Sequence, residues 1–198
     1  MKIVTSVLSA LFVLGLAGSA LAGGDCCKEA KMANGWCGEC DYGFAFGTKI
    51  TSAKLHKALA GEKVNADAIE CPGCKKAAHD NGTCDHCHVY FNNGVVYHSQ
   101  VSQILAKGVA TDMAKTTCEG CTMAAKTNGW CDDCNVGIVS GYAYKDKKDF
   151  KAAGHAHKVL MAATEASAKC EACAVAMVTD GTCESCKVSF KHGQMVKG

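Results

Sequence analysis

Apolar and polar positions alternate in four short stretches of this chain, and each stretch follows a cysteine. Apolar or aromatic side chains stand two and four residues after that cysteine, which is the period of a β-strand. A glycine comes seven residues after it and another apolar residue three positions later, so each stretch predicts a β-hairpin with a glycine turn. The predicted turn glycines are Gly47, Gly94, Gly141 and Gly193, and the returning strands carry Ile50, Tyr97, Tyr144 and Val196.

The segments between these hairpins have a helical pattern. Residues 52–61 and 99–108 each begin with a serine that can cap a helix and end with a glycine. Residues 145–169 are rich in alanine and predict the longest helix. We expect neighbouring parts of the chain to pack on one another through these helices. In the longest one, the predicted packing residues are Phe150, Val159, Leu160 and Met161.

All 16 cysteines fall into four groups, and the last three groups read C-x2-C-x9-C-x2-C. The first group has Gly24 where the others have their first cysteine, and it carries an extra cysteine next to its second one. An alanine after the second cysteine and an Asn-Gly or Asp-Gly pair before the third also recur, which indicates four tandem units. The groups are Cys26, Cys27, Cys37 and Cys40; Cys71, Cys74, Cys84 and Cys87; Cys118, Cys121, Cys131 and Cys134; and Cys170, Cys173, Cys183 and Cys186.

The stretch between the two cysteine pairs of a unit differs along the chain. In units one to three it is rich in alanine, lysine and methionine, which predicts a short helix closed by the glycine of the Asn-Gly pair. In unit four, residues 174–178 read Ala-Val-Ala-Met-Val and predict a strand before an Asp-Gly turn.

The spacing of the cysteines predicts metal sites. A C-x2-C turn places two sulfurs on one side of a tight loop, and two such turns can surround one tetrahedral ion with four thiolates. The gap between the pairs is nine residues in every unit, and pairing within units leaves no cysteine pair without a partner. We therefore predict one site in each unit, with all sixteen cysteines as ligands. In unit one, Cys26 would have to fold back as the fourth ligand, which makes this the weakest site.

The segment Cys71-Pro72-Gly73-Cys74 resembles the knuckles of zinc-ribbon and rubredoxin-type proteins. The resemblance covers residues 71–87 and the matching segments of the other units, not the whole chain. It implies zinc as the ion that best fits tetrahedral thiolate, and iron as an ion that the same cage accepts. The predicted fold class is small metal-stapled α+β repeats, namely four tandem zinc-ribbon-like units of a double knuckle plus a β-hairpin, joined by short α-helices.

The N-terminus predicts export. Lys2 is followed by an apolar run and by Ala20-Leu21-Ala22, which is typical of a signal-peptide cleavage site. The run is shorter than the roughly 20 residues that span a bilayer, so we expect no stable membrane insertion after cleavage. The predicted location is the periplasm or the extracellular space. The predicted divisions are the signal peptide at 1–22 and repeats at 23–61, 62–108, 109–166 (with the long linker helix) and 167–198, which we call units one to four.

Export also supports an alternative, because thiols outside the cytoplasm tend to oxidise. A disulfide-stapled secreted protein of the same shape would use the same cysteines. Disulfides closed inside C-x2-C turns are typical of redox centres, however, and the pair spacing is more specific for metal. A periplasmic thiol–disulfide redox protein is the best enzymatic alternative. No other catalytic signature is present, so we predict that the protein is not an enzyme.

One motif suggests haem. The segment Cys84-Asp85-His86-Cys87-His88 matches the attachment signature of c-type haem. The cysteines are already explained by the repeat, and the other units have no histidine at the position of His88, so we predict no covalent haem.

The charge composition excludes one class of partner, nucleic acid. The 21 basic residues are all lysine and stand against 19 acidic ones, so the chain has no electrostatic footprint for nucleic acid. The predicted partners are metal ions and another exported protein, for which the chain would act as a scaffold or interaction module. His155 and His157 would lie on one side of an extended segment and could bind copper or zinc there, but we expect them to be simply exposed on a polar face. Trp36 and Trp130 are predicted to cover the neighbouring sulfurs from water.

Overall fold

The computed structural model describes residues 26–196. The predicted signal peptide and Gly24 lie outside the described residues, and of Cys26 only the backbone is described. Within the described part, no helix has the length and apolar character needed to cross a membrane.

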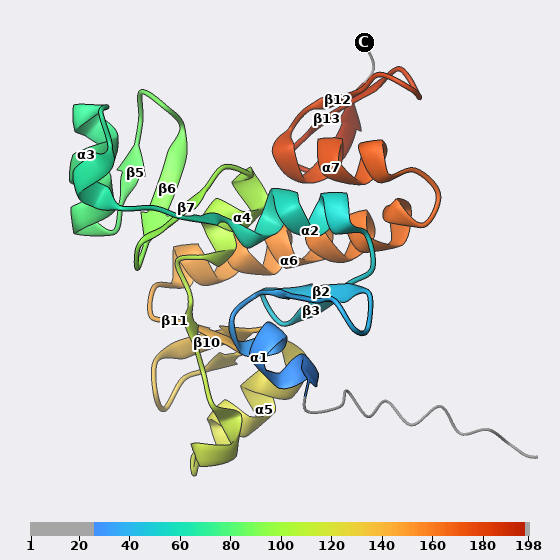
Figure 1. Cartoon of the computed structure of the whole chain (residues 1–198). Coiled ribbons are helices and arrows are strands. Elements are labelled where there is room, and N and C mark those ends of the chain that lie inside the picture. Colours follow the sequence, from blue (N-terminus) through green and yellow to red (C-terminus); the bar gives the residue numbers. More distant parts are fainter. Residues whose placement is uncertain (1–25, 197–198) are drawn as a thin grey trace, which may run out of the picture.

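The described chain mixes short helices with small antiparallel sheets (Figure 1). The helices are α1 (Cys26–Met32), α2 (Ala53–Ala60), α3 (Pro72–Asp80), α4 (Gln100–Leu105), α5 (Glu119–Thr127), α6 (Lys147–Ser167) and α7 (Glu171–Thr179), with 3-10 turns η1 (Ala66–Ala68) and η2 (Met113–Lys115). The strands are β1 (Trp36–Cys37), β2 (Tyr42–Ala45), β3 (Thr48–Ile50), β4 (Glu62–Lys63), β5 (Thr83–Cys84), β6 (Val89–Asn92), β7 (Val95–Tyr97), β8 (Val109–Ala110), β9 (Trp130–Cys131), β10 (Val136–Val139), β11 (Tyr142–Tyr144), β12 (Thr182–Cys183), β13 (Val188–Lys191) and β14 (Gln194–Val196).

Each cysteine group lies on the same succession of elements: a short helix, a two-residue strand and a hairpin. The hairpins are β2–β3, β6–β7, β10–β11 and β13–β14, so the four predicted hairpins are confirmed. Both central residues of each turn have positive φ, as a type I′ turn requires. These pairs are Phe46–Gly47, Asn93–Gly94, Ser140–Gly141 and His192–Gly193.

The Asn-Gly signature ties each helix end to the tip of its hairpin. In unit two, Asn81 takes the left-handed conformation after α3, and Gly82 N–H donates to the carbonyl of Ala77 over 2.9 Å. The Oδ1 of Asn81 accepts the backbone N–H of Asn93 at 2.7 Å. The sequence predicted that the glycine of this pair closes the helix. That prediction is wrong by one position, because Asn81 takes the left-handed conformation. Asparagine takes the left-handed place because its short polar side chain tolerates it and bonds locally.

The predicted strand at residues 174–178 is wrong, because this segment lies in helix α7. Ala174 and Val178 are fully buried at an i, i+4 spacing, which places both on one helix face. Burial of that face outweighs the β-propensity of the valines.

The three predicted linker helices are confirmed as α2, α4 and α6. Ser52 and Ser99 cap the first two, accepting the N–H groups of Leu55 and Ser102. Asp146 caps α6, which is the longest described helix at 21 residues. Within it, Val159 and Leu160 are buried as predicted, whereas Met161 is exposed, so its prediction as a packing residue is wrong.

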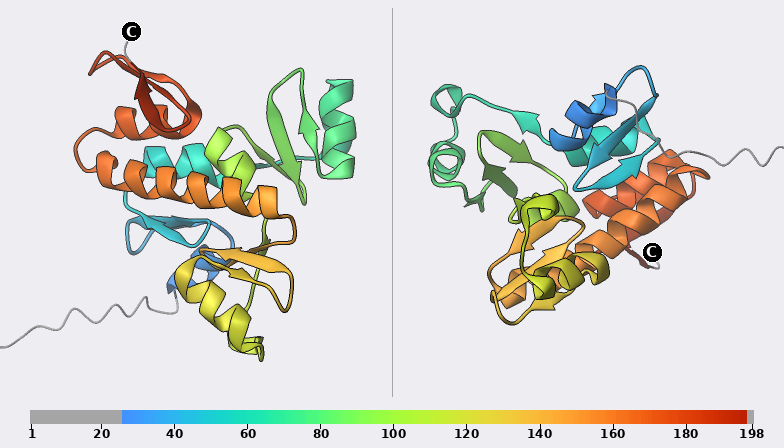
Figure 2. Two further views of the ribbon diagram at one scale, coloured as in Figure 1. Left: turned by 180° about the vertical axis from the view of Figure 1, so that it is seen from behind. Right: turned by 90° about the horizontal axis from the view of Figure 1, so that it is seen from below.

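Helices α2, α4, α6 and α7 meet at the centre of the molecule, and we call this group the helical hub. Figures 1 and 2 show α6 crossing the middle, with the hairpins arranged around it. The hydrophobic core around these helices, which we call the hub core, contains side chains from all four units and no cysteine among its described members. Its fully buried large residues are Phe46, Ile50, Leu55, Leu59, Leu105, Val139, Leu160 and Val178.

Three smaller hydrophobic clusters lie outside the hub, one each in units two, three and four. Each combines cysteines with the alanine of the short helix and one large residue of the hairpin. These large residues are Phe91, Ile138 and Phe190. Strands β4 and β8, which the sequence did not predict, add a fourth strand to the sheets of units two and three.

Candidate metal centres

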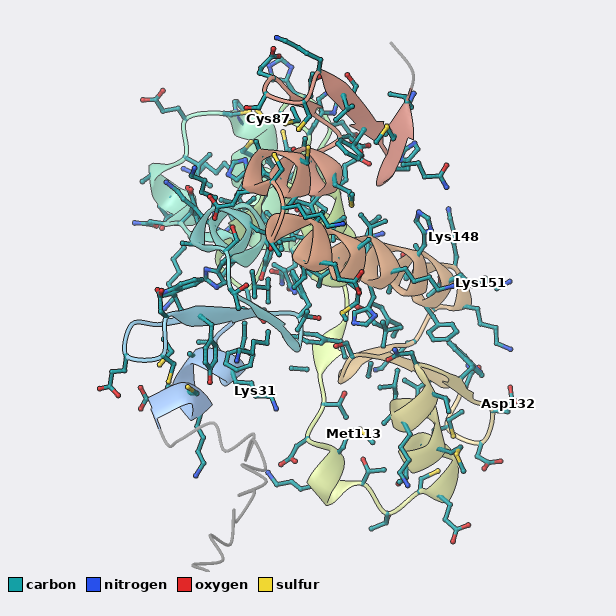
Figure 3. All side chains as sticks on the ribbon, turned by 90° about the vertical axis from the view of Figure 1, so that its right-hand side faces the viewer. Lys31, Cys87, Met113, Asp132, Lys148 and Lys151 are labelled. Carbon is teal, nitrogen blue, oxygen red and sulfur yellow. The ribbon has the colours of Figure 1, made fainter. Side chains whose placement is uncertain are left out.

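The structure brings the sulfurs of each described group together. In units two, three and four, four sulfurs lie within 4.8 Å of one another, and in unit one the described side chains of Cys27, Cys37 and Cys40 do so. The groups are separate. In Figure 3, Cys87 of unit two and Asp132, which follows Cys131 of unit three, lie at opposite sides of the molecule.

The distances within a group favour a shared ion. Cys71 Sγ lies 3.8 Å from Cys87 Sγ, and Cys118 Sγ lies 3.6 Å from Cys134 Sγ. Four sulfurs at about 2.3 Å from a tetrahedral zinc are about 3.8 Å apart, whereas a disulfide requires about 2.05 Å. The sulfurs therefore stand where a tetrahedral ion would hold them.

The disulfide alternative receives no support from this geometry. No two sulfurs among the described cysteine side chains are at disulfide bonding distance. The four groups could each hold a metal ion, as the spacing predicted.

Two local structures position the sulfurs in each complete group. In unit two, Cys71 caps α3 with an extended backbone, Pro72 starts the helix, and Cys74 follows in its first turn. Cys84 ends strand β5, and Cys87 lies in the turn that leads to β6. Cys74 and Cys84 are buried, Cys71 is half-buried and Cys87 is exposed. The site of unit two is thus sealed toward the protein and open to solvent on one side.

The helix start also sets the charge of the first sulfur. The backbone N–H of Cys74 favours the thiolate of Cys71 and lowers its pKa to about 7. Burial raises the pKa of the Cys74 thiol well above its ordinary value. The first cysteines of units three and four follow the same rule, because the backbone N–H groups of Cys121 and Cys173 lower the pKa of Cys118 and Cys170 to about 7.

The residue after the fourth cysteine has a conformational role in every unit. Asp41, His88, Asn135 and Lys187 all have φ between 50° and 54°. Aspartate, asparagine and histidine are enriched in this left-handed region. The left-handed turn thus gives His88 a conformational role. Its backbone carbonyl also accepts a hydrogen bond from Nε2 of Gln103 at 2.8 Å. Cys84 and Cys87 belong to the four-sulfur group of unit two.

Unit one differs in a way that the sequence did not reveal. The hydroxyl of Tyr42 lies 3.1 Å from Cys27 Sγ, and Cys27 Sγ lies 3.3 Å from Cys40 Sγ. Tyr42 stands directly opposite Cys37 in the antiparallel ladder of β1 and β2. The residues at this register position in the other units are Val89, Val136 and Val188. The sequence pattern predicts only an apolar strand residue at this position.

Four other side chains were given roles from the sequence, and the structure contradicts the prediction for two of them, His155 and His157. Trp36 packs against His56 and Trp130 against Phe150, each with ring centroids 5.4 Å apart, so both indoles face linker helices. His155 and His157 lie in helix α6 rather than in an extended segment.

His56 was given no role from the sequence, yet it is buried. Its Nε2 lies 3.0 Å from the carbonyl oxygen of Asn34 and 3.2 Å from that of Phe44. A single histidine in a predicted linker helix carries no signal for such contacts.

Comparison with protein-family models, curated proteins and solved structures finds no match to this chain. The fold and the sulfur groups by themselves define an α+β protein with clustered thiols that could hold metal ions.

Proposed function

We propose that this is an exported cysteine-rich repeat protein that binds structural zinc through one site in each of its four zinc-ribbon-like units. The observation that carries the proposal is the sulfur–sulfur spacing of 3.6 to 3.8 Å in units two to four. Four thiolates fill a tetrahedral site, which is the ligand count of structural rather than catalytic zinc. The chain is accordingly proposed to be a scaffold or interaction module for another exported protein, and not an enzyme.

The role of the metal follows from the size of the outer clusters. The cluster of unit four contains only Ala176, Cys183 and Phe190 as buried members. Helix α7 is also held by the hub, but so small an apolar surface does not offset the entropy of ordering the hairpin β13–β14. A metal ion that joins the helix start to the β-turn supplies the missing free energy, as in other small metal-dependent folds.

Native mass spectrometry of the protein isolated from its own compartment tests the proposal. We expect one zinc for each intact sulfur group and a polypeptide mass without disulfides or covalent haem. Cys84→Ser should lose one zinc, and the matched variant Thr83→Ser, one residue earlier on β5, should keep all of them. A metal-free chain with the mass of its disulfide form would contradict the proposal.

Export is tested on the same sample. Cleavage after Ala22 predicts a mature chain that begins at Gly23. An N-terminal sequence beginning at Met1, in a protein recovered from the cytoplasm, would contradict this part of the proposal.

A further inference from the structure

Unit one is held in the molecule by different contacts from the other units. In units two, three and four, cysteines pack into the local cluster around Phe91, Ile138 and Phe190. Among residues 26–196, the buried hydrophobic residues of the unit-one hairpin, Ala45, Phe46 and Ile50, all belong to the hub core. The hub therefore holds this hairpin in place in addition to any contact that the hairpin makes with its own sulfurs.

The positions that seal the other sites are looser in unit one. Ala30 is half-buried, although the matching alanines of the other units are buried. Phe44 is also half-buried, and its ring packs edge-on against Tyr42 at a centroid distance of 5.5 Å. The apolar side chains around α1 thus pack less tightly than those around α3, α5 and α7, although Cys27 and Cys37 themselves are buried.

Tyr42 adds a polar group to this site. Its ring is held between Phe44 and the ammonium group of Lys49, which lies 3.8 Å from the ring centroid. This arrangement points the hydroxyl at Cys27 Sγ, 3.1 Å away. The valines at this position in the other units offer no donor.

The hydroxyl acts on the sulfur as a hydrogen-bond partner. Its distance of 3.1 Å from Cys27 Sγ is that of a hydrogen bond. The usual zinc ligands are cysteine, histidine and carboxylate side chains, not a tyrosine hydroxyl. When metal binding removes the proton of Cys27, the remaining proton is on the phenol, so Tyr42 donates and the thiolate accepts.

A hydrogen bond donated to a metal-bound thiolate withdraws charge from the sulfur and weakens its bond to the metal. Outer-shell partners that raise the basicity of a ligand strengthen metal binding by about 10- to 100-fold, and a donor to a thiolate lowers its basicity, so it acts in the opposite direction. We propose that unit one is an exchange site for a thiophilic divalent metal ion, which it can release and rebind while the fold persists. This inference rests on the proposed function, which makes the other three sites structural.

Isotope exchange on the full-length zinc-loaded chain tests the inference. The protein is mixed with an excess of isotopically enriched zinc and followed by native mass spectrometry. We expect one zinc to exchange well before the others. Cys37→Ser should remove this fast zinc, while Cys84→Ser should remove one of the slow ones.

Tyr42→Phe tests the hydrogen bond itself, because it removes only the hydroxyl and keeps the ring. We expect the fast exchange to slow by about 10-fold or more. Tyr90→Phe, on the hairpin of unit two, is the matched control and should leave the rate unchanged. Hydrogen exchange adds a second readout. Cys37→Ser should keep the amides of β3 protected, and Cys84→Ser should expose those of β6, whose Val89 and Phe91 pack with Cys84.

Each outcome has one meaning. If all bound zinc ions exchange together, or if Tyr42→Phe exchanges as fast as the unchanged protein, the inference is wrong and the proposed function stands. If Cys26→Ser rather than Tyr42→Phe sets the exchange rate, the tuning by Tyr42 is wrong. If no zinc is bound at all, the proposed function fails first, and the exchange site fails with it.

Discussion

The hydroxyl of Tyr142 donates a hydrogen bond to the Oδ1 of Asn34 over 3.1 Å, and this contact joins the hairpin of unit three to the helix end of unit one. The same Oδ1 accepts the backbone N–H of Phe46 at 2.8 Å. Beside it, the turn of unit one touches the turn of unit three, where a Cβ on Gly47 would collide with the carbonyl oxygen of Ser140. Units one and three, which are far apart in the sequence, thus contact each other at the tips of their hairpins.

Gly47→Ala should destabilise the protein more than Gly94→Ala. Both glycines have positive φ, which costs alanine about 1–2 kcal/mol. Only Gly47 faces a second unit, and overpacking there should cost a further 1–3 kcal/mol, roughly. At Gly94 the nearest atom to the added Cβ is 3.9 Å away. Urea unfolding of both variants measures the difference, and equal losses would show that the two tips do not pack together.

Leu160→Ala should lower the free energy of unfolding by about 2–5 kcal/mol, because Leu160 is fully buried in the hub. Met161→Ala is the neighbouring control on the same helix. With 42% of its surface exposed, Met161 should change stability by no more than about 0.5 kcal/mol. Comparable losses for the two variants would place the hub core elsewhere.

Removal of the metal by a chelator should unfold the clusters that contain cysteines and leave the helical hub folded. The described members of the hub core include no cysteine, whereas Cys74 and Cys84 are part of the cluster that holds α3 to the hairpin of unit two. We expect a zinc chelator to expose the amides of β5 and β6 to hydrogen exchange, while those of α6 stay protected. A reductant without chelator should change neither. Loss of structure with the reductant alone would favour disulfide staples.

Zinc affinity should fall as the pH falls, because a thiol must lose its proton to bind the metal. The raised pKa of Cys74 means that this proton is displaced by zinc throughout the neutral range. Cys71, whose pKa is lowered to about 7, begins to compete only below that pH. Each displaced proton changes affinity about tenfold per pH unit, so the dependence should be steeper below pH 7 than above it. Competition with a chelator from pH 6 to 8 measures the slope, and a flat profile would show that thiolates are not the ligands.

Local patterns carried much of the correct prediction. Alternating apolar positions followed by glycine predicted all four hairpins, since a type I′ turn needs positive φ at a fixed place. Capping serines predicted the first residues of α2 and α4 to within one position, because the cap interaction spans only three residues. The cysteine spacing predicted which sulfurs come together, because each pair sits on one tight turn.

The sequence by itself determined the units: their turns, their caps and the grouping of their sulfurs, all of which depend on residues within one short loop or turn. Only the tertiary structure decided how the units combine. Residues 174–178 became helical because the hub buries one face of α7, and His56 found its acceptors on residues of a different element. Tyr42 met Cys27 because strand pairing placed it opposite Cys37. Such contacts depend on where the chain returns in space, and a pattern of neighbouring residues does not encode that return.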